Sequence, residues 1–153
     1  FVDLSFLRPH PPCVSPEPYI KMFDPGDVPT PRRAASPEVE AAQHPYLSLM
    51  IENHRRHSYL LTHNGREADI ADITILQARA SYYGLMSEVD HHVGRIIDQL
   101  KGSGQYDQTL IIFTSDHGEH LGDHHLHGKH GYFDEALHIT HIIRGILNIA
   151  AAL

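Results

Sequence analysis

The chain has 153 residues, enough for one domain with a hydrophobic core but not for two ordinary domains. With 41% hydrophobic residues it has the composition of a globular protein, and no apolar run reaches the roughly 18 residues that a membrane span requires. The formal net charge of −7 argues against a nucleic-acid-binding protein, which usually carries a basic face, but leaves a small anionic ligand open.

The N-terminal residues 1–7 are predicted to form a buried strand, because Val2, Leu4 and Phe6 lie on one face of an apolar run. Residues 8–12, Arg-Pro-His-Pro-Pro, must leave the sheet, since proline cannot donate to a strand ladder. A chain that opens inside a strand, without an initiator methionine, is expected to be a piece of a longer protein.

A long ordered loop rich in proline, aspartate and glycine is predicted next, up to Pro37. Ser36 followed by Pro37 is the pattern of an N-cap and a first helical residue, and Pro45 limits the helix that they begin. A second helix is predicted from Tyr46 to about His57.

The strongest helical signal is a series of apolar residues spaced by three or four. These residues are Leu76, Ala80, Tyr83, Met86, Val89, Val93, Ile96 and Leu100. Asp72 can cap the start of this helix, and residues 102–104, Gly-Ser-Gly, end it. Such a stripe is typical of core packing, so we predict a crossover helix that lies on a sheet.

Residues 109–113 form a continuous apolar run of strand length, and residues 139–144 predict one more strand. A long helix followed by a buried strand is half of a parallel α/β unit. The predicted fold is therefore α/β, with a largely parallel sheet flanked by helices.

Asp116, His117 and Gly118 follow the predicted strand 109–113, at the edge where open α/β folds place their sites. A carboxylate and an imidazole can both face one ion here, because glycine removes the side chain that would hinder a tight turn. The alternative is that Asp116 caps the turn and His117 is a surface residue.

Residues 115–135 read Ser-Asp-His-Gly-Glu-x-Leu-Gly-Asp-His-His-Leu-x-Gly-Lys-x-Gly-Tyr-Phe-Asp-Glu. This pattern resembles the C-terminal signature of the sulfatase family of the alkaline phosphatase superfamily, and residues 122–135 are most similar to its phosphonate monoester hydrolases. Residues 8–12 resemble the His-x-Pro element of that family. The resemblance implies an alkaline-phosphatase-like catalytic domain, of which residues 1–144 are a C-terminal part and residues 145–153 a divergent tail.

The resemblance also implies roles for single residues. Asp116 and His117 would be two ligands of one divalent cation. The nitrogen donor moves the expectation towards manganese or zinc, with calcium still open. Lys129 would hold a substrate oxygen, and His10 would bind the substrate anion or protonate the leaving oxygen, which makes both catalytic and substrate-binding. The alternatives are an exposed surface lysine and an incidental histidine in a proline-rich turn.

The family's nucleophile, a formylglycine, is expected upstream of Phe1. Cys13 stands in Cys-Val-Ser-Pro-Glu rather than Cys-x-Pro-x-Arg, so we expect it to pack as a small apolar side chain. As the single cysteine, it excludes an internal disulfide and slightly favours the cytoplasm, without deciding the compartment.

The implied activity is metal-dependent hydrolysis of sulfate esters, phosphonate monoesters and phosphate diesters, and this chain alone is expected to be inactive. The expected partner is a small anionic ester, not nucleic acid or a membrane, and the full-length protein is compatible with a homo-oligomer. Many sulfatases carry asparagine in place of His117, so the histidine favours the phosphonate-cleaving relatives.

Two alternatives remain at this point. The first is an arylsulfatase-type sulfuric ester hydrolase with the same parts. The second is a non-catalytic metal-binding module that uses the histidine-rich loop. Its ligands would be His120, His124, His125, His127 and His130. Otherwise we expect His120, His127 and His130 to be incidental, and Asp123 and His124 have no assigned role.

Overall fold

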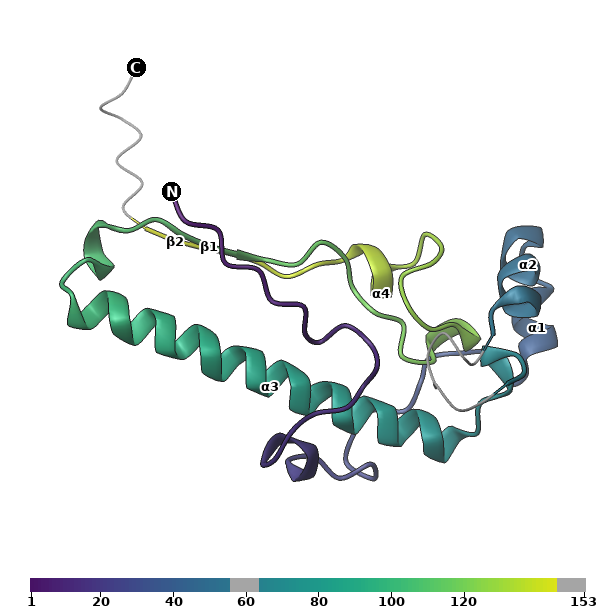
Figure 1. Ribbon diagram of the computed structural model, residues 1–153. Helices are drawn as coiled ribbons and strands as arrows, with labels where there is room; N and C mark the ends of the chain where they lie inside the picture. Colours follow the sequence, from purple (N-terminus) through teal and green to yellow (C-terminus); the bar gives the residue numbers. More distant parts are fainter. Residues whose placement is uncertain (56–63, 146–153) are drawn as a thin grey trace, which may run out of the picture.

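One long helix, α3, sets the length of the molecule in the computed structural model, which describes residues 1–55 and 64–145 (Figure 1). The described α-helices and strands are α1 (Pro37–Ala41), α2 (Pro45–Asn53), α3 (Asp72–Gly102), β1 (Ile111–Thr114), α4 (Asp134–Leu137) and β2 (His141–Arg144). The short 3₁₀ turns are η1 (Tyr19–Lys21), η3 (Glu67–Asp69), η4 (Tyr106–Gln108) and η5 (Asp123–His125). The strand pair runs beside the C-terminal half of α3, and α1 and α2 lie at the N-terminal end of α3.

The bounds of α3 agree closely with the predicted helix. Its first turn differs, because the N-cap residue is Ala71, whose side chain makes no capping bond. Asp72 lies inside the helix and forms an ion pair with Arg33, so the prediction that it caps the helix is wrong. The end is as predicted: Gly104 has φ +71°, a left-handed conformation that favours glycine after a helix.

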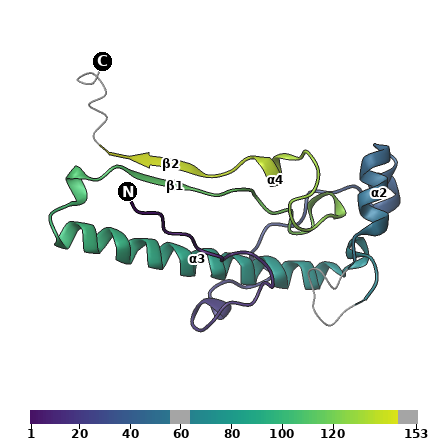
Figure 2. The same ribbon diagram turned by 45° about the horizontal axis from the view of Figure 1, so that its top comes forward.

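Of the predicted apolar stripe of α3 only Ala80 is buried, and Met86 is 50% exposed. The other buried apolar side chains of the helix, Ile75 and Leu85, are not part of that stripe and lie in the N-terminal half. The C-terminal half has no fully buried residue, because the N-terminal segment and the strand pair cover it only loosely (Figure 2). None of the helices in the described part of the chain is long and apolar enough to cross a membrane.

The two small helices begin at their prolines. Pro37 is the first residue of α1, and the Ser36 side chain accepts a hydrogen bond from the Val39 N–H, so this predicted start is confirmed. Helix α2 begins at Pro45, where the His44 side chain accepts from the Tyr46 N–H, one residue before the predicted start. It ends at Asn53, and the predicted extension to His57 lies outside the described residues.

The two described strands pair in antiparallel fashion, with Ile111 opposite Arg144 and Thr114 opposite His141. Both strands fall on predicted segments, but their faces are exposed rather than buried. The predicted parallel neighbours are not among the described strands. Residues 1–7 form no strand and are exposed, so that prediction is wrong for this structure. The segment runs between the strand pair and α3 and pairs with neither of the described strands, whereas a strand requires such a partner (Figure 2).

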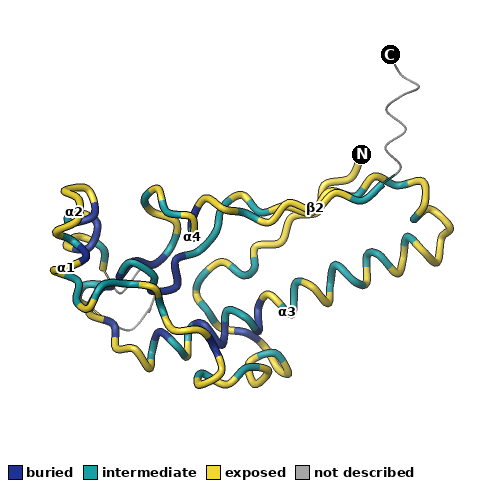
Figure 3. The backbone as a smooth tube through the Cα atoms, turned by 180° about the vertical axis from the view of Figure 1, so that it is seen from behind, coloured by how far each residue is buried: buried dark blue, intermediate teal, exposed yellow. Residues whose placement is uncertain are grey.

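The core lies where α1, α2 and the start of α3 meet the loop after β1 (Figure 3). One cluster contains Leu47, Met50, Ile51, Ala68 and Leu126, and the other contains Ile70, Ile75 and Leu121. Cys13 packs against the second cluster, as predicted for a small apolar side chain. Leu121 and Leu126 both belong to the loop, so hydrophobic burial holds this loop against the helices.

Two glycines of α3 provide a matched test of this packing. A Cβ at Gly84 would lie 2.4 Å from the carbonyl oxygen of Tyr19, whereas a Cβ at Gly94 would meet nothing within 4 Å. We expect Gly84→Ala to lower the free energy of unfolding by about 1–3 kcal/mol through overpacking. Gly94→Ala should leave it unchanged or raise it by up to about 1 kcal/mol, because alanine favours the helix. Denaturant unfolding measures both, and equal effects would contradict the close contact at Gly84.

Candidate functional site

The turn after β1 brings Asp116 and His117 side by side. The His117 N–H donates to Asp116 Oδ1 over 3.0 Å, and Ser115 Oγ donates to the His117 carbonyl oxygen over 2.5 Å. These two bonds close a tight turn directly after Thr114, the last residue of the strand. His117 Nε2 lies 3.6 Å from Asp116 Oδ2. The two predicted metal ligands therefore point to one place at the end of β1.

Gly118 is required by a close approach of two backbones. A Cβ at this position would lie 2.0 Å from the carbonyl oxygen of Glu135, and the Gly118 N–H donates to the Ala136 carbonyl oxygen over 2.8 Å. The sequence predicted glycine here for a tight turn. The structure shows that the glycine lets the turn lie against α4, and any larger residue would separate them.

A hydrogen bond sets the tautomer of His117. Its Nδ1 lies 2.7 Å from the Gly118 carbonyl oxygen, which can only accept, so Nδ1 carries the proton and Nε2 carries the lone pair. Histidines that bind metals usually have this arrangement, with the second ring nitrogen donating to a carbonyl or carboxylate. The Asp116 side chain is 86% exposed and is open to an ion. These two donors fit a divalent cation.

The pair does not form a complete metal site within residues 1–55 and 64–145. No group of three or more histidine, cysteine, aspartate or glutamate side chains in this part of the chain is arranged to hold a metal ion. Divalent cations that prefer oxygen ligands usually take about six of them. Asp116 and His117 would therefore supply only part of a coordination shell.

Lys129 is brought to the same place from twelve residues further along the chain. Its Nζ donates to His117 Nε2 over 3.1 Å, and the lysine is exposed. The loop turns back at Gly128, which has φ +77° and whose carbonyl oxygen accepts from the His120 N–H over 2.9 Å. The structure thus places the predicted anion-binding cation beside a predicted metal ligand.

His10 lies in the neighbourhood of this group. Its Nδ1 lies 2.7 Å from the carbonyl oxygen of Pro11, and the Arg8 guanidinium donates to the carbonyl oxygen of Pro12 over 3.0 Å. The imidazole is therefore held on a stiff, exposed turn. No hydrogen bond among the described residues joins it to Asp116, His117 or Lys129, although its charge acts on Glu119, two residues after His117.

Glu119 was not singled out in the sequence, although it follows the Asp-His-Gly turn directly. It is half-buried, and its carboxylate accepts a hydrogen bond from the Gly128 N–H. Burial raises the pKa of this carboxyl, and the N–H groups of Gly128 and Leu121 oppose the rise. Glu119 therefore lies between the predicted metal ligands and the lysine loop.

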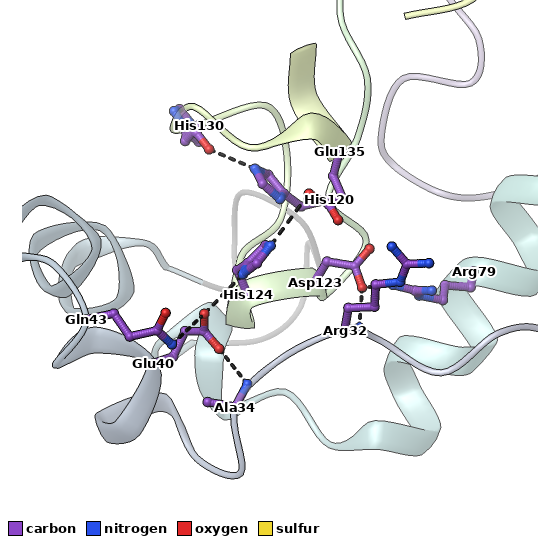
Figure 4. A network of polar contacts seen from close by, with 10 residues as sticks. All are labelled: Arg32, Ala34, Glu40, Gln43, Arg79, His120, Asp123, His124, His130 and Glu135. Atoms are coloured by element: carbon purple, nitrogen blue, oxygen red, sulfur yellow. Dashed lines mark hydrogen bonds and ion pairs between the residues drawn. The ribbon is translucent and has the colours of Figure 1, made fainter. Parts of the chain in front are cut away.

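Asp123, which had no assigned role, anchors the loop to α3. Its Oδ1 accepts from Arg79 Nη2 over 2.8 Å and from the backbone N–H of Arg32 over 2.5 Å (Figure 4). The buried Arg79 also donates to the carbonyl oxygens of Leu121 and Pro29. One ion pair thus joins three segments that are far apart in the sequence.

His124 anchors the same loop to α1. Its Nδ1 lies 3.0 Å from Oε1 of the buried Glu40 (Figure 4). Its ring stacks on Phe133 with centroids 3.8 Å apart. On the other side its Nε2 lies 3.6 Å from Glu135. Burial acts to raise the pKa of Glu40, but the Ala34 N–H and His124 outweigh it, so the pKa is lowered.

The prediction that His120 and His127 are incidental is wrong, because both are almost completely buried. His120 Nε2 donates to the His130 carbonyl oxygen over 2.7 Å, and His125 Nε2 lies 3.0 Å from that of Ala34. These rings form structural contacts with separate partners, so the geometry does not favour a shared metal among the loop histidines.

A buried glutamate and two histidines lie where the loop meets α2. Glu67 Oε2 is 3.6 Å from His54 Nδ1 and 4.0 Å from His127 Nδ1. Burial, followed by the charge of Glu119, raises the pKa of Glu67 to about 7. Burial also lowers the pKa of His54, and it lowers that of His127 to about 3. The low dielectric thus favours the neutral form of all three groups.

Known proteins resemble this chain over nearly its whole length. The sulfatase family model matches residues 1–151. The multifunctional alkaline phosphatase superfamily protein PehA of Trinickia caryophylli is 47% identical over 144 residues, 94% of this chain and 28% of PehA. An arylsulfatase of Clostridium perfringens is 29% identical over 177 residues, 98% of this chain and 34% of that enzyme.

The fold is matched by a solved structure. The phosphonate monoester hydrolase of Agrobacterium radiobacter superposes with a TM-score of 0.87 at 46% identity, over 92% of this chain and 28% of that one. The predicted α/β fold is therefore confirmed. The chain spans about a third or less of the length of each of these relatives.

The raised pKa of Glu67 predicts a pH-dependent stability. Its folded pKa of about 7 lies above the reference value of 4.5. The contribution of Glu67 to the free energy of unfolding is therefore fully present below about pH 4.5 and is lost as the pH rises through 7. Glu67→Gln keeps the neutral form at all pH values. Between pH 4.5 and pH 8 we expect the free energy of unfolding of the variant, relative to that of the original protein, to rise by on the order of 2 kcal/mol. Unfolding at both pH values measures this, and a difference that is constant with pH would contradict it.

Proposed function

The chain belongs to the sulfatase family, and on this premise we propose that it supplies one side of an active site that hydrolyses phosphonate monoesters, phosphate diesters or sulfate esters. The supporting observation is the convergence of three side chains. His117 Nε2 lies 3.6 Å from the Asp116 carboxylate and 3.1 Å from the Lys129 ammonium. The lone pair of His117, the carboxylate of Asp116 and the ammonium of Lys129 lie close enough together to suit the binding of a metal ion and an anionic ester.

The metal would be held by Asp116 through its carboxylate and by His117 through Nε2, where it would take the lone pair that accepts from Lys129 and so leave the ammonium to the substrate. A bound divalent cation supplies Lewis acidity, which polarises the non-bridging oxygens of the ester. The mixed nitrogen and oxygen donors suit manganese or zinc, with calcium as the third candidate. We propose that the remaining ligands and the formylglycine nucleophile come from parts of the protein outside this chain.

Lys129 and His10 would act on the substrate. The Lys129 ammonium would donate to a substrate oxygen and offset the negative charge that grows in the transition state. His10, whose Nδ1 donates to the Pro11 carbonyl oxygen, would in its protonated form donate from Nε2 to the anion or to the leaving oxygen. The exposure of both side chains is consistent with contact to a ligand.

The phosphonate side of this range is favoured over sulfate. The identity is 46% to the phosphonate monoester hydrolase but 29% to the arylsulfatase. The second candidate, an arylsulfatase-type sulfuric ester hydrolase, is supported by that weaker match.

Kinetics separate these two candidates. For the complete protein we expect kcat/KM to be higher for an aryl phenylphosphonate than for the aryl sulfate with the same leaving group. Equal leaving groups leave the anionic centre as the variable. A preference for the sulfate would favour the second candidate.

Substitutions separate metal binding from substrate binding. In the complete protein, Asp116→Ala and His117→Ala should each lower bound metal and turnover together, because each removes a ligand. Lys129→Ala and His10→Ala should lower kcat/KM by about 10²- to 10³-fold and leave the metal in place.

Elemental analysis of the purified variants measures metal content beside the rates. Asp90→Ala, which removes an exposed carboxylate of α3, is the control. Wild-type metal content and rate in Asp116→Ala or His117→Ala would refute that ligand. Metal loss in Lys129→Ala or His10→Ala would refute the division of roles.

A further inference from the structure

The position of Lys129 depends on its backbone, because its exposed side chain is not held by surrounding packing. The ammonium reaches His117 Nε2, 3.1 Å away, only because the loop after Gly118 returns to the turn from which it started. A lysine side chain is a flexible stem of four carbons, so its ammonium is easily displaced. The residue before it therefore decides where the ammonium can reach.

That residue, Gly128, is fixed from both sides. Its N–H donates to the Glu119 carboxylate, and its carbonyl oxygen accepts from the His120 N–H over 2.9 Å. Its φ of +77° is left-handed, so the chain reverses here in a conformation that other residues rarely adopt. Both partners directly follow Gly118, so the short segment that carries His117 also holds the base of Lys129.

Of the two bonds, the one to Glu119 depends on a side chain. The carboxyl is half-buried, and it accepts backbone N–H groups of Gly128 and Leu121. When a buried acceptor is removed, the N–H that it served is left without a partner, which costs about 1–3 kcal/mol. The loop can avoid this cost only by moving its N–H groups towards water, and Lys129 would move with them.

We propose that Glu119 is a positioning residue that keeps Lys129 beside the Asp116–His117 turn by holding the backbone of Gly128. It does not touch the substrate, and it acts through the length and direction of its side chain. The inference rests on the proposed function, since it gives Lys129 its role at the anion.

Three substitutions distinguish length from charge. Glu119→Gln keeps the length and the accepting oxygen but not the charge. Glu119→Asp keeps the charge but is one methylene too short to reach Gly128. In the complete protein we expect Glu119→Asp and Glu119→Ala to lower kcat/KM by about 10- to 100-fold, the size of the loss that a 1 Å misplacement causes. Gln should stay within about threefold, because its amide oxygen still accepts the bond. If Asp retains more activity than Gln, the charge is what matters and the proposal is wrong.

A double-mutant cycle tests whether the effect passes through Lys129. If it does, Glu119→Ala should change kcat/KM less than about twofold once Lys129→Ala is present, since the positioned group is gone. Losses that multiply would show a general structural defect and would overturn the proposal. The Glu119→Asp variant with Lys129→Ala gives a second cycle if the alanine variant folds poorly.

A measurement without turnover completes the test. Amide hydrogen exchange of the segment 120–133 should become faster in Glu119→Asp and Glu119→Ala, and remain slow in Glu119→Gln and Lys129→Ala. Metal content should be unchanged in all four variants. Unchanged exchange in Glu119→Ala would refute the anchor itself. Absence of metal-dependent ester turnover in the unsubstituted protein would refute the proposed function, whereas turnover with multiplicative losses would refute only the role of Glu119.

Discussion

The guanidinium of Arg79 holds the loop after β1 in place. It is buried on α3 and donates to the carbonyl oxygens of Leu121 and Pro29 and to the carboxylate of Asp123. Each of these acceptors lies on a segment with no regular secondary structure or only a single turn, so helix and sheet bonds do not fix it. Removal of one partner from a buried ion pair typically costs about 3–5 kcal/mol, because the other charge stays unpaired. The site at the end of β1 therefore depends on a residue that does not belong to it.

The sequence predicted elements whose causes are local. The start of α1 follows from Ser36 and Pro37, and the span of α3 follows from its apolar spacing. The strand at residues 1–7 was wrong because a strand forms only beside a partner, and apolar alternation does not show whether the partner is present. The antiparallel pairing of β1 and β2 likewise depends on segments about thirty residues apart.

The candidate site was predictable only where its residues are neighbours in sequence. Asp116 and His117 are neighbours in sequence, and a strand followed by a turn indicated where they lie. The contact of Lys129 with His117, and the bond from Gly128 to Glu119, require knowledge of how the loop folds back. The roles of Asp123 and His124 depend on residues 44 and 84 positions away, Arg79 and Glu40, which no local pattern reveals. The many histidines suggested metal binding, yet several of them serve the core.

The contact between Gly118 and α4 has a consequence for how this site can vary. The carbonyl oxygen of Glu135 occupies the space of a side chain at position 118, so every replacement there must move a helix. Position 117 has less constraint, since the bonds that close the turn use the backbone N–H and carbonyl oxygen of His117, and its ring adds only the hydrogen bond to the Gly118 carbonyl oxygen. A change of ligand at 117 therefore leaves the turn intact. With His117 as the proposed metal ligand, exchange of this one side chain would change the ion preference while the turn that carries it stays in place.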